Sequence, residues 1–469
     1  MADALDIHMI AIGGTGMAPL ACLLKDAGHR VEGSDGPLYP PMSTLLLKAG
    51  IETKKGFDPG NLEPEPDLVI VGNAVPRSNP EAEETERRGL DRISMPEALA
   101  RFFLADRDPL VVAGTHGKTT TTSIAAWVYT HAGREPGYLI GGVPRNLESG
   151  FVAGTGDRFI IEGDEYNAAY FDRGAKFLHY RPQAAILTSV EYDHADLYPD
   201  PESLLEAYRA FVRLIPEDGV LAACGDSRAV LEVAGHASCR VVTYGLGEHN
   251  DVHPSGKVEA DLDGSHFEIV DASGTTEIVL PHGGDHNVQN ALAVWAVARF
   301  DGLPRRAIAE ALAGFTGVRR RMEELATHDG ITVVDDFAHH PTAIGATLDA
   351  LRAKYHGRRL VVAFEPRSLT AARAFLFDDY CGAFRRADRV FLAPVFHADR
   401  LSDEERLDTT ALVAEVRALG VAASTSDSVD DLESNLLPIL RRGDVVVTMS
   451  SGSFEGLPHR LVKHLSEQA

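Results

Sequence analysis

Short apolar runs alternate with amphipathic stretches along the chain. In the first hundred residues, the runs 8–14 and 67–75 predict strands, and residues 18–35 predict a helix followed by a further strand. Alternation of strands and helices is typical of βαβ units that build a parallel sheet. A polar pair in front of a proline predicts a linker at residues 107–109.

The same alternation resumes after the linker. A strand, a glycine-rich turn and a helix are predicted over residues 109–133, and two apolar strands that end in acids are predicted at 157–165 and 183–196. Short polar, β-rich pieces fill residues 236–284 before a helix at 287–300. Four apolar strands separated by helices complete the pattern, at 331–341, 358–368, 388–395 and 444–452.

These three blocks predict an α/β protein of three domains. We expect an N-terminal Rossmann-like domain, a central P-loop ATPase-like domain and a C-terminal Rossmann-like domain, at residues 1–107, 108–318 and 319–469. No solenoid repeat and no low-complexity tract interrupts the pattern.

The composition of the chain excludes several classes of protein. The chain of 469 residues is 44% hydrophobic and 24% charged, and its formal net charge of −24 disfavours binding to nucleic acid. No apolar run reaches the ~18 residues of a membrane helix, and the N-terminus lacks the basic region of a signal peptide. Four cysteines without a C-x-x-C pair indicate neither a zinc knuckle nor a disulfide framework. We expect a cytoplasmic protein without membrane partners.

A candidate phosphate loop occupies residues 113–122, AGTHGKTTTT, between an apolar strand and a helix. Glycines allow backbone N–H groups to face phosphate oxygens, and the helix N-terminus adds positive potential. Lys118 is expected to reach the β- and γ-phosphates, and the Thr119 hydroxyl to ligate Mg²⁺. Val112 replaces the first glycine of the G-x-x-x-x-G-K-[ST] pattern, so a tight turn with an incidental lysine is the alternative.

Acids follow the two apolar strands of the central block. Glu162 is expected to meet the metal beside Thr119, and Glu191, Asp193 and His194 could complete a second metal position. Oxygen ligands with one imidazole suit Mg²⁺ or Mn²⁺ better than zinc. Taken singly, each acid could equally be a solvated loop residue.

Two further clusters suggest ligand contacts. Asp335, Asp336, His339 and His340 could form a metal site, a ribose clamp or a capped helix start, and residues 319–321 could form an arginine fork for a phosphate or carboxylate.

Glycines near the N-terminus, Gly13, Gly14 and Gly16, follow a strand, and Asp35 lies 19 residues beyond Gly16. Pro19 stands at the third glycine of the G-x-G-x-x-G pattern, which leaves a partial match. The match supports a diphosphate ligand without requiring a nicotinamide.

Six motifs in fixed order carry a resemblance to a known family: GTHGKTTTT, E-x-D-E, VEYDH, HNVQN, RRRME and DDFAHHPT. Together they resemble the Mur ligase family of ATP-dependent, amide-forming enzymes. The resemblance covers the whole chain. It implies an N-terminal domain that binds a UDP-sugar, a central ATPase domain, and a C-terminal domain for the incoming amine.

The resemblance also implies roles for residues of this chain. ATP contacts are expected from Gly114, Thr115, His116, Gly117, Lys118, Thr119, Thr120, His286, Asn287, Asn290, Arg321 and Asp336. Mg²⁺ ligands are expected from Thr119, Glu162 and His194. Catalytic roles fall to Lys118, Glu191, His194 and His339. Substrate contacts are expected from Gly13, Gly14, Gly16, Ser34, Asp35, Asn73 and Arg367.

Four segments, 39–46, 72–80, 162–180 and 364–368, are similar to one branch of the family. That branch joins the murein tripeptide L-alanyl-γ-D-glutamyl-meso-diaminopimelate to UDP-N-acetylmuramate in peptidoglycan recycling. The resemblance therefore implies these two partners. The alternatives are the sister branch that adds L-alanine, a nicotinamide dehydrogenase that uses the N-terminal glycines, and a non-catalytic regulator that binds a UDP-sugar.

Overall fold

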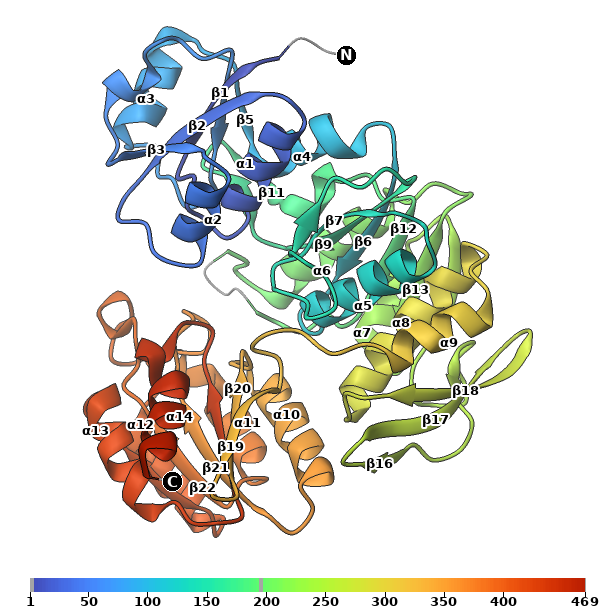
Figure 1. Ribbon diagram of the computed structural model, residues 1–469, viewed down its shortest axis with the longest axis vertical. Coiled ribbons are helices and arrows are strands. Elements are labelled where there is room, and N and C mark those ends of the chain that lie inside the picture. The colour runs from blue at the N-terminus through green and yellow to red at the C-terminus, as the bar shows by residue number, and fades with distance from the viewer. Residues whose placement is uncertain (1–3, 194–196, 469) are drawn as a thin grey trace.

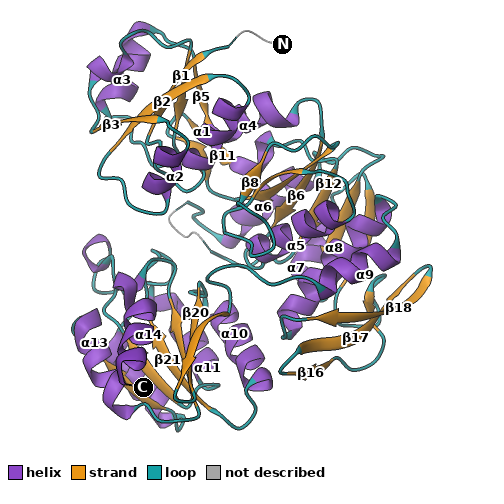
Figure 2. Cartoon of the chain, in the orientation of Figure 1, coloured by secondary structure: helices purple, strands orange, loops and turns teal. Residues whose placement is uncertain are grey.

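Three open sheets, one in each third of the chain, organise the protein (Figure 1). The computed structural model describes residues 4–193 and 197–468. Helices cover the sheets and loops connect them (Figure 2). The three-domain α/β fold predicted from the sequence is confirmed.

The N-terminal sheet is parallel throughout, with the strand order β3-β2-β1-β4-β5. Its strands β1 and β4 are buried at every position except Asp6, because helices pack on both faces of a parallel sheet. The strands are β1 (Asp6–Ile10), β2 (Arg30–Asp35), β3 (Glu52–Lys55), β4 (Leu68–Val71) and β5 (Arg92–Ser94). The helices are α1 (Met17–Asp26), α2 (Met42–Lys48), α3 (Pro80–Arg88) and α4 (Met95–Leu99).

The central sheet has the order β14-β13-β12-β6-β9-β7-β8, with β8 alone antiparallel to its neighbour among the described strands. The strands are β6 (Asp108–Ala113), β7 (Gly137–Leu139), β8 (Phe151–Val152), β9 (Arg158–Gly163), β12 (Ala184–Leu187), β13 (Val220–Cys224) and β14 (Arg240–Tyr244). The helices are α5 (Lys118–His131), α6 (Pro201–Val212), α7 (Arg228–Ala234), α8 (Asp285–Phe300) and α9 (Arg305–Ala313).

The prediction of a linker at residues 107–109 is wrong for its last two residues, because β6 already begins at Asp108. Pro109 stands in the second position of the strand, paired with Phe159 of β9. The start of a strand tolerates a proline, since the missing N–H removes no hydrogen bond from the inner part of the ladder.

Two smaller elements extend the central domain. A hairpin of β10 (Asn167–Ala169) and β11 (Asp172–Ala175) reaches the N-terminal domain. An antiparallel sheet occupies the β-rich region expected from the sequence and consists of β15 (His253–Pro254), β16 (Glu259–Asp261), β17 (Gly264–Asp271) and β18 (Gly274–Leu280).

The C-terminal sheet has the order β19-β20-β24-β21-β22-β23, and β19 is its antiparallel edge strand. The strands are β19 (Glu323–His328), β20 (Ile331–Asp336), β21 (Arg359–Phe364), β22 (Arg389–Leu392), β23 (Ala422–Thr425) and β24 (Asp444–Met449). The helices are α10 (Pro341–Lys354), α11 (Phe377–Phe384), α12 (Thr409–Ala418), α13 (Val429–Leu436) and α14 (Leu457–Gln468). The sequence predicted four of these strands and missed the polar edge strands β19 and β23.

The two domain junctions differ in character. One apolar cluster runs from the N-terminal sheet into the central sheet, and the rings of Phe103 and Phe159 lie 6.3 Å apart within it. At the tip of the β10–β11 hairpin, the guanidinium of Arg92 lies over the rings of Tyr170 and Phe171, 4.9 Å from the centre of the Phe171 ring. The C-terminal domain instead has apolar clusters of its own on the two faces of its sheet.

Candidate active site

Strand order places the candidate chemistry at one edge of the central sheet. Since β6, β9 and β12 are parallel neighbours, the segments that follow them emerge side by side. These segments carry the phosphate loop at 113–122, Glu162 with its acidic neighbours, and Glu191. Such an edge is where open α/β sheets bind ligands.

The phosphate loop is built on two glycines with positive φ. Gly114 has φ +133°, and a Cβ there would lie 2.2 Å from Thr188 Oγ1. Gly117 has φ +80° at the N-cap of α5, and a Cβ there would lie 2.8 Å from Asn290 Oδ1. Both positions therefore require glycine, and the loop packs closely against its surroundings while the helix N-terminus stays open to a ligand.

Lys118, the first residue of α5, is held by a buried acid. Its Nζ donates to the Gly114 carbonyl at 2.6 Å and lies 3.0 and 3.2 Å from the two carboxylate oxygens of Glu165. Burial opposes the charge on Lys118, but the carboxylates of Glu165, Asp164 and Glu162 together outweigh it, so the pKa of the lysine lies above its usual value. Glu165 is the last residue of the E-x-D-E motif, and its role depends on this contact, which the motif alone does not predict.

Thr119 and Glu162 meet as predicted. Thr119 Oγ1 lies 3.1 Å from Glu162 Oε2, and Gly141 N donates to Glu162 Oε1 at 2.6 Å. Arg321, from the connection to the C-terminal domain, donates to Thr119 Oγ1 at 3.2 Å. Burial and the nearby Asp164 raise the pKa of Glu162, as expected for a carboxylate that lacks a full counter-charge.

The other arginines of the 319–321 run act elsewhere. Arg319 is exposed. Arg320 binds Asp335 at 3.2 Å and donates to the carbonyls of Ser450, at 2.8 Å, and Gly452. Of the three, Arg321 alone donates to a phosphate-loop side chain in the described contacts.

Residues of α8 line the loop on a second side. Asn290 Oδ1 accepts a hydrogen bond from Thr121 Oγ1 of α5 at 2.9 Å, and Asn287 is buried beside it. Burial lowers the pKa of His286 to about 4, so its imidazole is neutral. Thr120 lies in the first turn of α5.

In the C-terminal domain, Asp336 ends β20 and shapes the turn that follows. Its carboxylate accepts from the backbone N–H of Ala338 at 2.7 Å and of Met322 at 2.6 Å. His340 caps α10, and Pro341 is the first helical residue. The capped helix start, one of the three alternatives for this cluster, is therefore present. Burial lowers the pKa of His339.

Glu191 joins the central and C-terminal domains. Its Oε2 lies 3.1 Å from His116 Nε2, accepts from Thr342 Oγ1 at 2.7 Å, and lies 3.7 Å from His340 Nδ1. Burial opposes its charge, but the hydrogen bonds from His116 and Thr342 lower the pKa of Glu191 to about 2. Thr115 orients the segment, since its Oγ1 accepts from Glu191 N at 2.8 Å.

The N-terminal acid predicted to contact a ligand is used within the fold. Asp35 accepts from the backbone N–H of Gly13 and of Gly36, both at 2.7 Å. Ser34 is buried and donates to Glu81 at 2.5 Å. Asp35 therefore fixes the glycine turn through these two backbone contacts.

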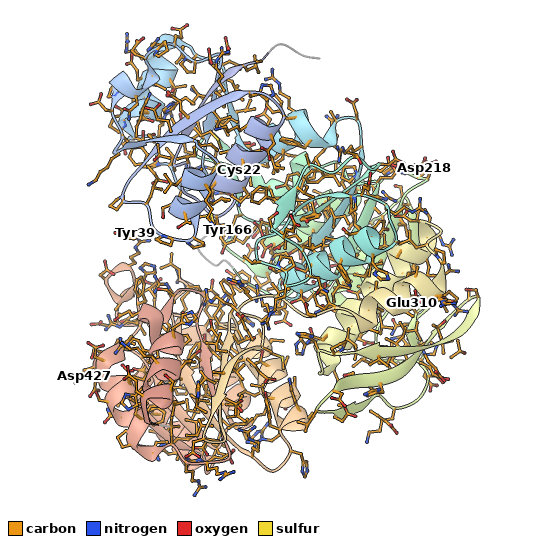
Figure 3. All side chains as sticks on the ribbon, viewed as in Figure 1. Cys22, Tyr39, Tyr166, Asp218, Glu310 and Asp427 are labelled. Carbon is orange, nitrogen blue, oxygen red and sulfur yellow. The ribbon has the colours of Figure 1, made fainter. Side chains whose placement is uncertain are left out.

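Other predicted substrate residues border the same turn. Gly14 is part of it, Gly16 is the N-cap of α1, and Asn73 is exposed after β4. Figure 3 shows Tyr39 and Tyr166, both exposed, on the side of the N-terminal and central domains that faces the C-terminal domain.

Arg367 lies apart from these groups. Its guanidinium stacks on Phe396, 3.7 Å from the ring centre, and lies 3.4 Å from a carboxylate oxygen of Glu365. A Cβ on Gly452 would lie 2.0 Å from its Nε, so a glycine there makes room for the side chain.

His194, predicted as a metal ligand, lies outside the described residues. Its neighbour Asp193 is buried at the end of the same segment. Two partners found by the structure, Glu165 and Thr342, could not be located by spacing, because each meets its partner only through the tertiary fold. Among the described residues, no helix has both the length and the apolar character needed to cross a bilayer.

Comparison with protein families gives three consecutive matches. Residues 6–107 match a Mur ligase family catalytic domain, residues 112–298 a Mur ligase middle domain, and residues 320–452 a Mur ligase glutamate ligase domain.

Individual relatives cover nearly the whole chain. The chain is 40% identical, over 99% of both proteins, to a UDP-N-acetylmuramate–L-alanyl-γ-D-glutamyl-meso-2,6-diaminoheptandioate ligase of Escherichia coli (strain K12). It is 36% identical, over 95% of both, to a UDP-N-acetylmuramate–L-alanine ligase of Solidesulfovibrio magneticus. The crystal structure of a murein peptide ligase from Psychrobacter arcticus superposes with a TM-score of 0.74 at 33% identity, covering 98% of this chain and 99% of the other.

Proposed function

The chain belongs to the Mur ligase family, and from that membership we propose that it joins the tripeptide L-alanyl-γ-D-glutamyl-meso-diaminopimelate to UDP-N-acetylmuramate with hydrolysis of ATP to ADP and phosphate. The observation that carries the proposal is the meeting of Thr119, Glu162 and Arg321 beside the phosphate loop. The ligase of this name in Escherichia coli supports the choice of substrates. Because ATP and UDP-sugars are cytoplasmic metabolites, we place the reaction in the cytoplasm.

The chain's residues fit ATP with Mg²⁺. The positive-φ glycines and the open N-terminus of α5 suit the phosphates, and Lys118 supplies a cation beside them. Thr119 and Glu162 offer a hydroxyl and a carboxylate, the hard oxygen ligands that Mg²⁺ prefers. When bound, Mg²⁺ neutralises charge on the transferring phosphoryl group.

We propose two chemical steps. The lactyl carboxylate of UDP-N-acetylmuramate attacks the γ-phosphorus of ATP in line, which gives an acyl phosphate and ADP. The α-amine of the tripeptide then attacks the acyl carbon, and the C–O bond to phosphate breaks as the amide forms. Lys118 and Arg321 offset negative charge during the first step.

The second step needs a base for the amine proton. Glu191, with a pKa of about 2, is a weak base, whereas His339 carries a neutral imidazole at pH 7 because burial lowers its pKa. We therefore assign proton removal to His339, and to Glu191 the positioning of the loop that joins the two domains.

The alternatives differ in what supports them. The L-alanine-adding reaction is the second candidate, since a ligase of that name is 36% identical over 95% of its length. A nicotinamide dehydrogenase would leave the central phosphate loop, with Lys118 and Thr119, unexplained. A non-catalytic regulator would still use Lys118 and Thr119 to bind ATP, so the release of phosphate distinguishes it from a ligase.

The deciding experiment measures phosphate release with ATP, Mg²⁺ and UDP-N-acetylmuramate, adding tripeptide, L-alanine or no amine. We expect release with the tripeptide and the ligated product by mass spectrometry. Faster turnover with free L-alanine would replace the assignment by the sister reaction. Binding of ATP without phosphate release under any condition would refute enzymatic function.

A further inference from the structure

Two histidines and a glutamate from separate loops meet at the boundary between the central and C-terminal domains. His116 belongs to the phosphate loop, Glu191 to the segment after β12, and His340 to the start of α10. One donor atom from each lies within 4.8 Å of the others. Within residues 4–193 and 197–468, no other group of three such side chains brings its donor atoms this close.

The spacing of the donor atoms suits a tetrahedral ion. Glu191 Oε2 lies 3.1 Å from His116 Nε2 and 3.7 Å from His340 Nδ1. Ligands at Zn–N and Zn–O distances of roughly 2.0–2.2 Å in a tetrahedron stand about 3.3–3.5 Å apart, between these two separations. The donor atoms of the two imidazoles lie within 4.8 Å of each other, so side-chain rotation is needed to bring all three atoms to one ion, and a bond to His340 Nδ1 replaces its 3.4 Å hydrogen bond from Thr342 N.

The surroundings of the three side chains also give an ion access. The side chains of Glu191 and His340 line a cavity of about 630 Å³, together with Tyr192, Thr342 and Phe375. The cavity gives an ion a path to the site and room for a fourth ligand.

We propose that His116, Glu191 and His340 bind one divalent transition-metal ion of the zinc type, across the boundary between the central and C-terminal domains. Two imidazoles with one carboxylate favour Zn²⁺ over Mg²⁺, which prefers oxygen ligands such as those of Thr119 and Glu162. This site shares no residue with the Thr119–Glu162 pair, although His116 belongs to the same phosphate loop, and ion binding can be measured without the proposed ligase reaction.

Occupancy would couple the two domains. An ion that binds Glu191 Oε2 competes with Thr342 Oγ1, which donates a hydrogen bond to the same atom. The lost hydrogen bond is replaced by coordinate bonds from the ion to residues of both domains. The bound ion therefore stabilises the folded, joined arrangement by an amount that grows with the logarithm of one plus its concentration divided by its dissociation constant. Domain opening, where turnover requires it, becomes slower.

The test uses the full chain, freed of metal by chelation and without nucleotide, titrated with Co²⁺. We expect one equivalent to produce the visible absorption of four-coordinate Co²⁺, Zn²⁺ to displace it, and Mg²⁺ to leave it unchanged. His340→Ala and Glu191→Gln should weaken Co²⁺ binding at least about 10-fold. Zn²⁺ should raise the melting temperature of the wild type more than that of either variant.

The matched control is His179→Ala. His179 lies 2.8 Å from Asp172, which makes a histidine–carboxylate pair within one domain, without a third such ligand among the described residues. This variant should bind Co²⁺ as the wild type does. Circular dichroism without metal checks that each variant is folded. Absence of the absorption in the wild type, its persistence in folded His340→Ala, or an equal loss in His179→Ala would overturn the proposal.

Discussion

Replacement of Lys118 by methionine tests whether one side chain serves both stability and catalysis. Methionine keeps much of the length of lysine and removes the charge. In the folded protein, Lys118 Nζ lies 3.0 Å from Glu165, and the two side chains are 14% and 2% exposed. The variant thus removes a cation from a nearly inaccessible carboxylate and, in the proposed reaction, from the phosphates.

The structure sets the size of both effects. Breaking a buried ion pair by removing one partner costs about 3–5 kcal/mol. Glu165 has further interactions, so we expect the lower end, about 3 kcal/mol. For a domain of this size, that corresponds to a fall of roughly 6–12 °C in melting temperature. Loss of one contact that stabilises transferring charge should reduce phosphate release by about 10²-fold or more.

The double variant Lys118→Met/Glu165→Gln separates the two roles. The neutral glutamine needs no counter-ion, so most of the lost stability should return, whereas phosphate release should stay as low as in Lys118→Met. Calorimetry and a coupled phosphate assay measure the two quantities. Near wild-type release by folded Lys118→Met would refute the phosphate-loop assignment. Equal destabilisation of the single and double variants would refute the ion-pair reasoning.

Three further predictions concern other parts of the molecule. Glu162→Gln should raise the Mg²⁺ concentration for half-maximal rate by about 10–100-fold in a Mg²⁺ titration, and an unchanged value would contradict its role as a ligand. Arg367→Lys should raise the KM for tripeptide about 30–150-fold and leave the KM for ATP unchanged, because lysine cannot reproduce a bidentate contact. If the variant and the wild type have the same KM for tripeptide, Arg367 has a structural role only. Burial opposes ionisation of Glu81, but hydrogen bonds from His8, Ser34 and Asn61 outweigh it and lower its pKa. Its stabilisation is therefore present above the ordinary pKa of ~4.5 and lost as pH falls, so Glu81→Gln should flatten the acid side of a thermal-unfolding profile; parallel profiles would exclude Glu81 as the source.

Local patterns predicted the parts of the site that are continuous in sequence. A strand, two glycines, a lysine and a helix follow one another within residues 108–131, and each needs only its neighbours to form. The meeting of Thr119 with Glu162 also followed, because parallel strands bring their carboxyl ends to one edge.

Sequence patterns could not predict the contacts between segments that are distant along the chain. Lys118 and Glu165 are 47 positions apart, and Glu191 and Thr342 are 151 apart, so their partnership depends on how whole domains pack. The edge strands β3 and β19 are rich in charged and polar residues and lack the apolar runs that revealed their neighbours. The pattern located Asp35, but the hydrogen bond to Gly13 decides what its carboxylate does.

The contrast between the two domain junctions sets how each responds to water. Separating the N-terminal from the central domain would expose the apolar surface around Phe103 and Phe159, at about 25 cal/mol for each Å². Water can replace the hydrogen bond between Glu191 and Thr342, and such an exchange changes the free energy by only about 0.5–1.5 kcal/mol. The first two domains are therefore held together by buried apolar surface, whereas this link to the third domain is a polar contact that water can replace.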